Sequence, residues 1–488
     1  MHNESSNPYD VVIIGAGFAG LCMGVKLREA ALQNFVILEK ADDLGGTWRE
    51  NTYPGAACDI PSALYSYSFA HNAGWESIWS GQAQILAYQH AVAEQHKLAP
   101  HIRYGQHINA IQFDADQAVW NVTTIDGTQY QARHVVSAVG QLHHPSVPDI
   151  THAAAYTGKC FHSAEWRHDL DLKGKRVAVI GNAASAVQFI PKVAEQAAAL
   201  TVFQRSPNWI LPKVDRHYSR WEQRLSARVP TITKLYRWAI WALGEYVLFP
   251  AIQGKPMRRW LIKQLCLRNL RRAVKDPELR HKLTPDYPVG AKRVLFGDQY
   301  FPALTRDNVT LCTDPVSEFT ETGLRTKAGH EIACDVVIYG TGFRTNPFLA
   351  DIEVLGRDQQ RLHSAWADGA HAYLGISTHG FPNLHFLYGP NTNLGHTSIL
   401  IMLEAQADYV IRLITHQQKL GQLCGEVRVA PETEFNAEVQ GRMQSLAFSE
   451  IDTSWYMHHG KITNNWVGGT REYQRRLAAF NPDDYQFS

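Results

Sequence analysis

Two short apolar runs, each followed by a turn of small residues and then by a helical pattern, are the most regular feature of the chain. Residues 10–14 (DVVII) lead into the turn GAGFAG, and residues 175–180 (KRVAVI) lead into the turn GNAASA. A continuous apolar run is typical of a parallel strand that is buried on both faces. The pattern therefore predicts two strand–turn–helix units, the first with its helix over residues 21–31.

The first turn has the glycine spacing of a dinucleotide-binding site. Gly15, Gly17 and Gly20 let the chain turn tightly, let the backbone approach a pyrophosphate and let the helix pack close to the strand. The next apolar run, residues 35–38, ends in Glu39, where a carboxylate can accept both hydroxyls of an adenosine ribose. We therefore expect FAD at this site.

The second turn contains Gly181, Ala183 and Ser185, with Ala183 in place of the middle glycine. Its second strand is followed by Arg205, at the same offset from the turn as the acid of the first unit. A guanidinium can form a bidentate pair with a ribose 2′-phosphate, and Ser206 can donate a further hydrogen bond. The pattern therefore favours NADP at the second site, and two such cofactors indicate a flavin-dependent oxidoreductase.

The repeated unit predicts an α/β fold with two Rossmann-like dinucleotide-binding domains, for FAD and NADP, and a helical insertion. Two further strand-to-glycine segments, residues 132–140 and 331–343, are typical of this architecture. The expected boundaries are 1–144 for the first part of the FAD domain, 151–212 for the first part of the NADP domain, 213–286 for the insertion, 287–375 for the second part of the NADP domain with a return strand, and 376–488 for the second part of the FAD domain.

The expected insertion is rich in Arg, Leu and Trp and has helical spacing, as in Trp238, Trp241, Val247 and Leu248. We interpret this aromatic stripe as core rather than as the wall of a substrate pocket. The apolar stretch 235–252 is interrupted by charges and proline, so it does not predict a membrane-spanning helix. Peripheral contact of the insertion with a membrane stays open.

Composition narrows the classes of function. The 488 residues carry 47 Lys and Arg against 46 Asp and Glu, and a formal net charge of +1 gives no field for steering onto nucleic acid. The 7 cysteines are scattered without a C-x-x-C pair, so neither a disulfide framework nor a metal site is indicated. With no secretion signal at the N-terminus, we expect a cytoplasmic protein.

Residues 156–167 (YTGKCFHSAEWR) resemble the linker signature F-x-G-x-x-x-H-x-x-x-W of the Baeyer–Villiger monooxygenases, a family of class B flavoprotein monooxygenases. Gly158, His162 and Trp166 fit the signature. Tyr156 stands in place of its Phe, and Arg167 stands where the family has Pro or Asp after the Trp. The resemblance covers nearly the whole chain. It implies the ketone-oxidising branch, which Trp166 separates from the amine- and sulfide-oxidising branch, and we interpret His162 as a linker histidine that positions the two domains.

The same resemblance implies the site residues. The segments GGTW and YPGAACD, which contain Thr47, Trp48 and Asp59, resemble the family's segment beside the flavin. Arg293 resembles the catalytic arginine of the family, which Asp59 would hold and tune. Lys292 resembles the lysine that joins the arginine of the second unit on the NADP 2′-phosphate.

The activity implied is FAD- and NADPH-dependent insertion of one oxygen atom from molecular oxygen next to the carbonyl of a small hydrophobic ketone. It would give an ester or lactone through a flavin peroxyanion, which a cationic donor can stabilise. An N- or S-oxygenating flavin monooxygenase, with an amine or sulfide as substrate, is the alternative, and it needs no Asp–Arg pair. A flavin disulfide reductase would need two cysteines near the flavin, and residues 45–61 contain only Cys58. A flavoprotein that binds NADPH without oxygenating a substrate is a further alternative.

Overall fold

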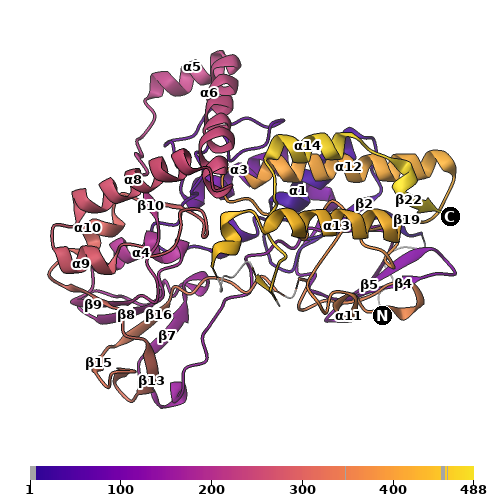
Figure 1. Cartoon of the computed structure of the whole chain (residues 1–488). Helices are drawn as coiled ribbons and strands as arrows, with labels where there is room; N and C mark the ends of the chain where they lie inside the picture. The colour runs from indigo at the N-terminus through magenta and orange to yellow at the C-terminus, as the bar shows by residue number, and fades with distance from the viewer. Residues whose placement is uncertain (1–6, 347, 452–456, 459) are drawn as a thin grey trace.

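The chain folds into two lobes, each built around a largely parallel sheet, with a helical insertion above one of them (Figure 1). The computed structural model describes residues 7–346, 348–451, 457, 458 and 460–488. Two such sheets in one chain confirm the predicted α/β class with two Rossmann-type domains.

The first lobe contains an eight-stranded sheet in the order β17-β4-β5-β6-β1-β2-β3, with β18 paired to β6. Its strands are β1 (Tyr9–Ile14), β2 (Phe35–Leu38), β3 (Ile102–Arg103), β4 (Ile108–Asp114), β5 (Val119–Thr124), β6 (Gln129–Ser137), β17 (Glu353–Leu355) and β18 (Leu384–Phe386). The central strand β1 runs parallel to both β2 and β6. Its Val11, Val12 and Ile13 are fully buried, as a two-sided strand requires.

Helices cover this sheet and close the lobe (Figure 1). They are α1 (Phe18–Glu29), α2 (Thr47–Glu50), α3 (Gln82–Gln95), α11 (Leu362–Ala365), α12 (Ile399–Leu420), α13 (Val429–Met443) and α14 (Thr470–Ala478). Helix α1 begins three residues earlier than the sequence predicts, because Gly17 is its extended N-cap and the helix follows the turn at once. It packs against α12, and both helices contribute buried residues to one hydrophobic core.

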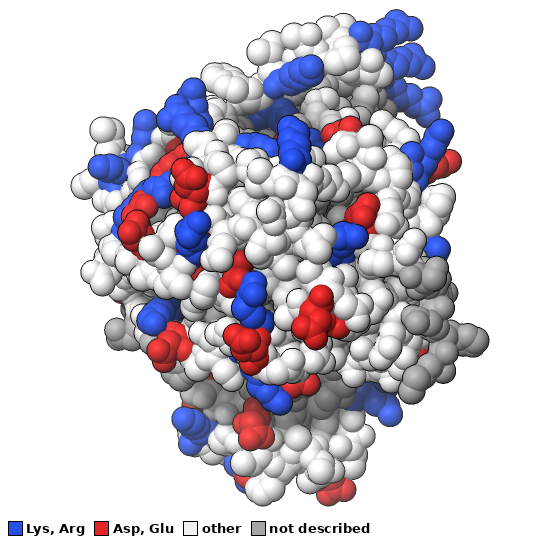
Figure 2. Space-filling view, turned by 90° about the vertical axis from the view of Figure 1, so that its right-hand side faces the viewer, with Lys and Arg blue, Asp and Glu red and all other residues white. Residues whose placement is uncertain are grey.

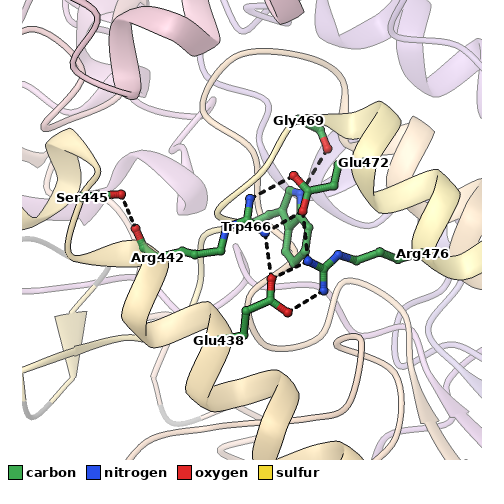
Figure 3. A network of polar contacts seen from close by, with 7 residues as sticks. All are labelled: Glu438, Arg442, Ser445, Trp466, Gly469, Glu472 and Arg476. Carbon is green, nitrogen blue, oxygen red and sulfur yellow. Dashed lines mark hydrogen bonds and ion pairs between the residues drawn. The ribbon is translucent and has the colours of Figure 1, made fainter.

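Two arginines and two glutamates join α13 to α14 in a closed network (Figure 3). Arg442 pairs with Glu472 at 2.6 Å and with Glu438 at 3.0 Å, and Arg476 pairs with both glutamates. The buried indole of Trp466 lies between the two guanidinium groups, at 6.0 and 5.7 Å from its ring centre. The network therefore fixes the start of α14, which reaches toward the insertion.

The second lobe contains a five-stranded parallel sheet in the order β12-β9-β8-β16-β7. Its strands are β7 (Lys159–His162), β8 (Arg176–Ile180), β9 (Ala199–Phe203), β12 (Val309–Cys312) and β16 (Val336–Tyr339), covered by α4 (Ala184–Ala194) and α10 (Tyr300–Leu304). A small antiparallel sheet, β13 (Val316–Thr320), β14 (Gly323–Thr326) and β15 (Glu331–Ala333), projects from it.

One sequence expectation about these strands needs correction. The single strand expected over residues 331–343 is split, since Glu331–Ala333 pairs with β14 and only Val336–Tyr339 enters the parallel sheet. The residues of β15 are largely exposed, as in a surface hairpin, whereas all four residues of β16 are buried. After β16 the chain returns to the first sheet, where β17 pairs with β4.

The insertion consists of α5 (Arg220–Arg228), α6 (Pro230–Leu243), a π-helical turn (Gly244–Leu248), α7 (Phe249–Ile252), α8 (Pro256–Ala273) and α9 (Pro277–Lys282), with β10 (Ile210–Leu211) and β11 (Leu295–Phe296) at its base. Of the expected aromatic stripe, Trp238 is not a core residue, because it is 61% exposed, whereas Trp241, Val247 and Leu248 are partly buried and pack against hydrophobic clusters. The π-helical turn changes the residue spacing between Trp241 and Val247, so the four residues do not share one face.

Short elements complete the second half of the first lobe: β19 (Gly425–Val427) pairs with β22 (Tyr485–Phe487), and β20 (Met457–His458) pairs with β21 (Lys461–Ile462). Among the residues that the structure describes, we find no helix with both the length and the apolar character needed to cross a membrane.

Candidate functional site

A cavity of about 390 Å³ lies at the carboxyl end of β1 and extends to the second lobe. The first glycine turn forms one side of it, and α4 of the second lobe contributes Ala184 and Gln188. Its lining includes most residues that the sequence assigns to the first cofactor: Gly15, Gly17, Glu39, Thr47, Trp48 and Asp59. Ligands bind at the carboxyl ends of strands in folds of this class, so the position fits a cofactor site.

The turn itself depends on two of its glycines for steric reasons. Gly15 has a φ of +103°, and a Cβ there would lie 2.8 Å from the carbonyl oxygen of Ala138. A Cβ at Gly20 would lie 1.9 Å from the carbonyl oxygen of Gly15, so this glycine allows the close approach of helix and turn. Gly17 faces the cavity, where the absence of a side chain leaves room.

Glu39 is buried at the end of β2 with its carboxylate fixed by backbone donors. Its oxygens accept hydrogen bonds from the amide of Ala16 at 2.7 Å and of Ala41 at 3.0 Å. These bonds orient the carboxylate beside the turn that would face a pyrophosphate. The expected contact of Glu39 with a ribose stays a prediction.

Further along the cavity, Trp48 donates a hydrogen bond from Nε1 to the hydroxyl of Tyr65 at 3.0 Å, and Thr47 begins the short helix α2. In the described part of the chain, Nδ1 of His143 and Oγ1 of Thr397 are buried polar atoms of cavity-lining residues that have no hydrogen-bond partner. Buried polar groups normally find partners, so these atoms fit a site built for a polar ligand. The residues present therefore fit FAD.

The second glycine turn lies at the carboxyl end of β8. Gly181 has a φ of +97°, and a Cβ there would lie 2.6 Å from the carbonyl oxygen of Gly340. Ala183 is the N-cap of α4 in an extended conformation, and Ser185 is buried with its hydroxyl 3.4 Å from that of Ser163. The turn therefore keeps the geometry of the first one despite its alanine.

Three side chains gather where the second cofactor's 2′-phosphate is expected. Lys292 donates a hydrogen bond from Nζ to Oγ of Ser206 at 2.9 Å, and Arg205 lies next to Ser206 in the chain. Burial and the charge of Arg205 lower the pKa of Lys292. Two cations held this close repel each other, and an anion between them would relieve the repulsion. The arrangement fits a phosphate, and the roles of the three residues stay predictions.

The structure brings Asp59 and Arg293 together across 234 positions of sequence. Nη2 of Arg293 donates to Oδ1 of Asp59 at 2.8 Å, and the two side chains are 31% and 24% exposed. The Asp59 loop is tied to the second lobe, because Gln188 of α4 exchanges hydrogen bonds with the backbone of Ala57. Arg293 lies two residues before β11, and the amide of Leu295 in β11 donates a hydrogen bond to the carbonyl oxygen of Trp209.

This ion pair stands between the first cavity and a second one of about 380 Å³, and both residues line both cavities. The second cavity is walled by α6 and α7 of the insertion, by the loop before α3 and by the loop before α12. Apolar side chains predominate in its lining: Ile60, Leu64, Trp79, Ile240, Leu248, Ile252, Ile262, Val289 and Phe296. Its polar lining residues are Asp59, Lys213, Tyr236, Lys292, Arg293, His396 and Thr397.

Sequence reasoning missed a buried pair at the wall of the second cavity. Oε2 of Glu245, in the π-helical turn, lies 3.4 Å from Nε2 of His396 and accepts hydrogen bonds from the amide and hydroxyl of Thr470. Burial opposes ionisation of Glu245, but the bonds from His396 and Thr470 outweigh it and lower its pKa. The signal available was one acid in an otherwise apolar helical stretch, which predicts a partnered buried charge.

The segment with the linker signature lies in the second lobe, where it contains β7, an edge strand of the parallel sheet. A Cβ at Gly158 would lie 2.2 Å from the ring of Tyr156, whose hydroxyl donates to the carbonyl oxygen of Cys334 at 3.0 Å. The hydroxyl that distinguishes Tyr156 from the signature's Phe is therefore satisfied. Burial lowers the pKa of His162, and its Nδ1 accepts from the amide of Ala164. Arg167 forms a surface ion pair with Asp169.

Cys58 lines the first cavity, and it is the one cysteine in that lining. Burial and the charge of Asp59 raise the pKa of its thiol, which therefore stays protonated near neutral pH. All 7 cysteines are free thiols. This lining does not supply the cysteine pair that disulfide reduction needs.

Sequence comparison finds relatives along the whole chain. The family described as pyridine nucleotide-disulphide oxidoreductase matches residues 12–232. A Baeyer–Villiger monooxygenase of Streptomyces coelicolor is 40% identical over 488 residues, which span 99% of this chain and 94% of that protein. A Baeyer–Villiger monooxygenase of Pseudomonas aeruginosa is 39% identical and covers 98% of this chain and 91% of its own length.

Structure comparison gives the same group of proteins. The structure of OTEMO in complex with FAD and NADP has a TM-score of 0.88 at 30% identity and covers 99% of this chain and 100% of that chain. Oxidised steroid monooxygenase bound to NADP has a TM-score of 0.89 at 29% identity, with 99% of each chain covered. Cyclohexanone monooxygenase of Rhodococcus sp. Phi1 bound to NADP+ has a TM-score of 0.89 at 26% identity, covering 99% of this chain and 100% of that chain.

Proposed function

The chain belongs to the Baeyer–Villiger monooxygenase family, and on that premise we propose that its Arg293–Asp59 pair and the apolar cavity beside it oxidise a small hydrophobic ketone. The protein is an FAD- and NADPH-dependent flavoprotein monooxygenase. It inserts one oxygen atom from molecular oxygen next to a ketone carbonyl and gives an ester or lactone. Bound FAD, once reduced by NADPH, supplies the activated oxygen.

The chain's own residues would hold the two cofactors at its two glycine turns. We assign Gly15, Gly17, Gly20, Glu39, Thr47, Trp48 and Asp59 to FAD, and Gly181, Ala183, Ser185, Arg205, Ser206 and Lys292 to NADP. The observation behind the second set is the hydrogen bond from Lys292 to Ser206, with the charge of Arg205 close enough to lower the pKa of Lys292. Because the 7 cysteines are free thiols, we expect the enzyme in a reducing compartment, the cytoplasm.

The ion pair at the junction of the two cavities is the observation that carries the catalytic assignment. A guanidinium is always cationic and carries its N–H donors in one plane, so the bond to Asp59 at 2.8 Å fixes the direction in which Arg293 donates. We assign to Arg293 the stabilisation of negative charge that builds on the carbonyl oxygen when the ketone is attacked. Asp59 is then a positioning residue for Arg293 that also lines the FAD cavity.

The second cavity supports a substrate with an apolar body and one polar end. Asp59 and Arg293 supply a charged pair to its lining, whereas most of its other lining side chains are apolar. A carbonyl placed at Arg293 would leave the hydrocarbon part among these walls and away from water. An amine or sulfide would gain nothing from the guanidinium, which favours a ketone.

The first prediction concerns Arg293→Ala. We expect the variant to retain FAD and to accept hydride from NADPH at a rate close to wild type, whereas ester formation falls by about 10²- to 10³-fold. Stopped-flow reduction under anaerobic conditions, followed by an oxygen pulse with ketone and mass spectrometry of the products, separates the two steps.

Arg167→Ala is the matched control, since Arg167 also pairs with an aspartate but on the surface. Loss of flavin reduction together with oxygenation in Arg293→Ala would contradict the assignment. Wild-type enzyme that oxygenates an amine or sulfide but leaves ketones unchanged would move the chain to the N- or S-oxygenating alternative.

A further inference from the structure

Exposed hydrophobic side chains are concentrated on the helical insertion. Among the described residues, thirteen of the nineteen large hydrophobic side chains that are exposed lie between positions 214 and 265. Single exposed hydrophobic residues are normal on a protein surface, but their concentration in one segment marks an interaction surface. The segment is the part of the chain that rises furthest from the two sheets (Figure 1).

The outer side of α5 and α6 carries an apolar ridge, which consists of Trp221, Leu225, Val229, Ile232, Leu235 and Trp238. Trp221 and Leu225 are four residues apart on α5, while Ile232, Leu235 and Trp238 follow at three-residue steps on α6, so each helix presents them on one side. No side chain of α5 or of α6 is buried. These two helices therefore pack by one side only and leave the ridge uncovered.

The helical segment that carries the ridge is strongly basic. Residues 220–275, which contain α5 to α8, carry 13 Lys and Arg against two Glu, whereas the whole chain has a formal charge of +1. Figure 2 shows Lys and Arg along the upper part of the molecule, while both signs are mixed over the lower part. The near-neutral net charge of the chain is therefore the sum of a positively charged insertion and a negatively charged remainder. A second copy docked ridge to ridge would bring two such cationic segments together and be repelled.

The ridge also lies next to the mouth of the second cavity. Val214 and Leu243 line this cavity and are 72% and 57% exposed, and Tyr236 of α6 is a third exposed lining residue. Ala239 and Ile240, which are on the same helix as Leu235 and Trp238, also line the cavity. One helix therefore separates the exposed apolar surface from the apolar cavity.

We propose that α5 and α6 dock on an anionic phospholipid surface, with the apolar ridge in the headgroup and acyl boundary and the basic side chains on the lipid phosphates. Exposed Trp and Leu flanked by Lys and Arg are the composition of helices that lie in a membrane interface. Resting on the proposed function, the same contact places the cavity mouth where an apolar ketone dissolved in the bilayer can enter without crossing water.

Vesicle binding by the FAD-loaded full-length enzyme tests the docking. We expect it to float with vesicles of phosphatidylcholine and phosphatidylglycerol, to bind vesicles of phosphatidylcholine alone more weakly, and to be released by high salt. The double variant Leu235→Glu, Trp238→Glu is expected to lower the affinity by about tenfold or more. The double variant Leu420→Glu, Val429→Glu adds the same two charges at exposed apolar positions of α12 and α13 and is expected to bind like wild type.

Wild-type enzyme that stays out of the anionic vesicle fraction, or a Leu235→Glu, Trp238→Glu variant that binds as well as wild type, would overturn the docking. So would ultracentrifugation showing a dimer that this variant alone dissociates, because a second copy would then cover the ridge. If the enzyme bound double-stranded DNA as tightly as anionic vesicles, the surface would recognise polyanions in general, and the lipid-docking proposal would be overturned.

Ketone oxidation separates this proposal from the proposed function. Leu235 and Trp238 do not line the cavity, so their variant should oxidise a short water-soluble ketone at the wild-type rate and a long-chain ketone embedded in vesicles about tenfold more slowly. Equal rates on the embedded ketone would overturn the entry route. Vesicle binding without oxidation of any ketone would leave the docking intact and overturn the proposed substrate.

Discussion

Lys292 and Arg293 are neighbours in the chain, yet their side chains face different partners. Lys292 bonds to Ser206 on the side of the second glycine turn, and Arg293 pairs with Asp59 on the side of the first. A segment of two residues thus connects the expected phosphate of NADP with the expected catalytic cation.

At this scale the choice between NADPH and NADH tests the second site. Arg205→Ala removes one of the two cations beside Ser206, so we expect KM for NADPH to rise by about 10- to 100-fold while KM for NADH stays within about twofold. Steady-state kinetics with both coenzymes measure the change. An equal rise for both coenzymes would show that Arg205 shapes the site without reading the phosphate, and Arg167→Ala is the surface control.

The pair of catalytic candidates shows where sequence reasoning reaches its limit. Glycine turns and the acid or arginine after the next strand are local patterns, and the structure has them at the ends of β1, β2, β8 and β9. Asp59 and Arg293 have no local pattern in common, and only the resemblance to a family brings them together before the structure does. The Glu245–His396 pair joins the π-helical turn to the loop before α12 in the same non-local way, so no local pattern predicts it.

At the scale of elements, strands buried on both faces are predictable, and half-exposed ones are less so. The sequence predicts the four buried residues of β16 as a strand. It does not separate β15 from β16, because only two residues lie between the two strands. On α6, a helical period predicts similar burial for Trp238 and Trp241, which are three residues apart. The structure leaves Trp238 61% exposed and packs only Trp241 against the core, because α6 contacts the body of the protein by one side.

The ring of charges between α13 and α14 makes an element-scale prediction (Figure 3). Glu438→Gln removes the partner that Arg442 and Arg476 share, and the pairing with Arg476 is the main cause that holds the pKa of Glu438 at about 2. Since the side chains are 29–40% exposed, we expect a loss of about 1 kcal/mol in the free energy of unfolding at low salt and less at high salt.

Chemical denaturation at two salt concentrations measures the loss from the Glu438 change. Glu278→Gln is the control, because Glu278 forms an exposed i,i+4 pair with Lys282 on α9 and should have no measurable effect. A salt-independent loss in Glu438→Gln would indicate that the network acts by packing around Trp466 rather than by charge.

At the scale of the whole molecule, charge and apolar surface are segregated. The insertion carries an excess of Lys and Arg and most of the exposed hydrophobic side chains, while the two lobes carry the compensating acids. The formal charge of +1 excludes a strong electrostatic field around the protein as a whole, but it does not describe the local charge of a single segment. A window of fifty residues along the sequence would have revealed the asymmetry.

Two histidines that are buried where β18 pairs with β6 make the free energy of unfolding depend on pH. Nδ1 of His134 and Nε2 of His385 are 3.3 Å apart. Burial, the neighbouring histidine and Arg133 hold the pKa of His134 well below its usual range, and burial lowers the pKa of His385 to about 3. Both side chains are therefore neutral in the folded protein near pH 6, whereas in the unfolded chain they take up protons near pH 6.5.

Because the unfolded chain binds more protons than the folded protein below about pH 6.5, the free energy of unfolding falls as the pH falls, by about 1.4 kcal/mol per pH unit for each such histidine. His385→Asn removes one of the two, so its stability should decline with acid about 1.4 kcal/mol per unit less steeply than that of wild type between about pH 6 and pH 4. Denaturant titrations of the holoenzyme at a series of pH values measure this slope. His281→Asn, a change at an exposed histidine of α9, should leave the slope of wild type, and a parallel slope for His385→Asn would mean that His385 already titrates in the folded sheet.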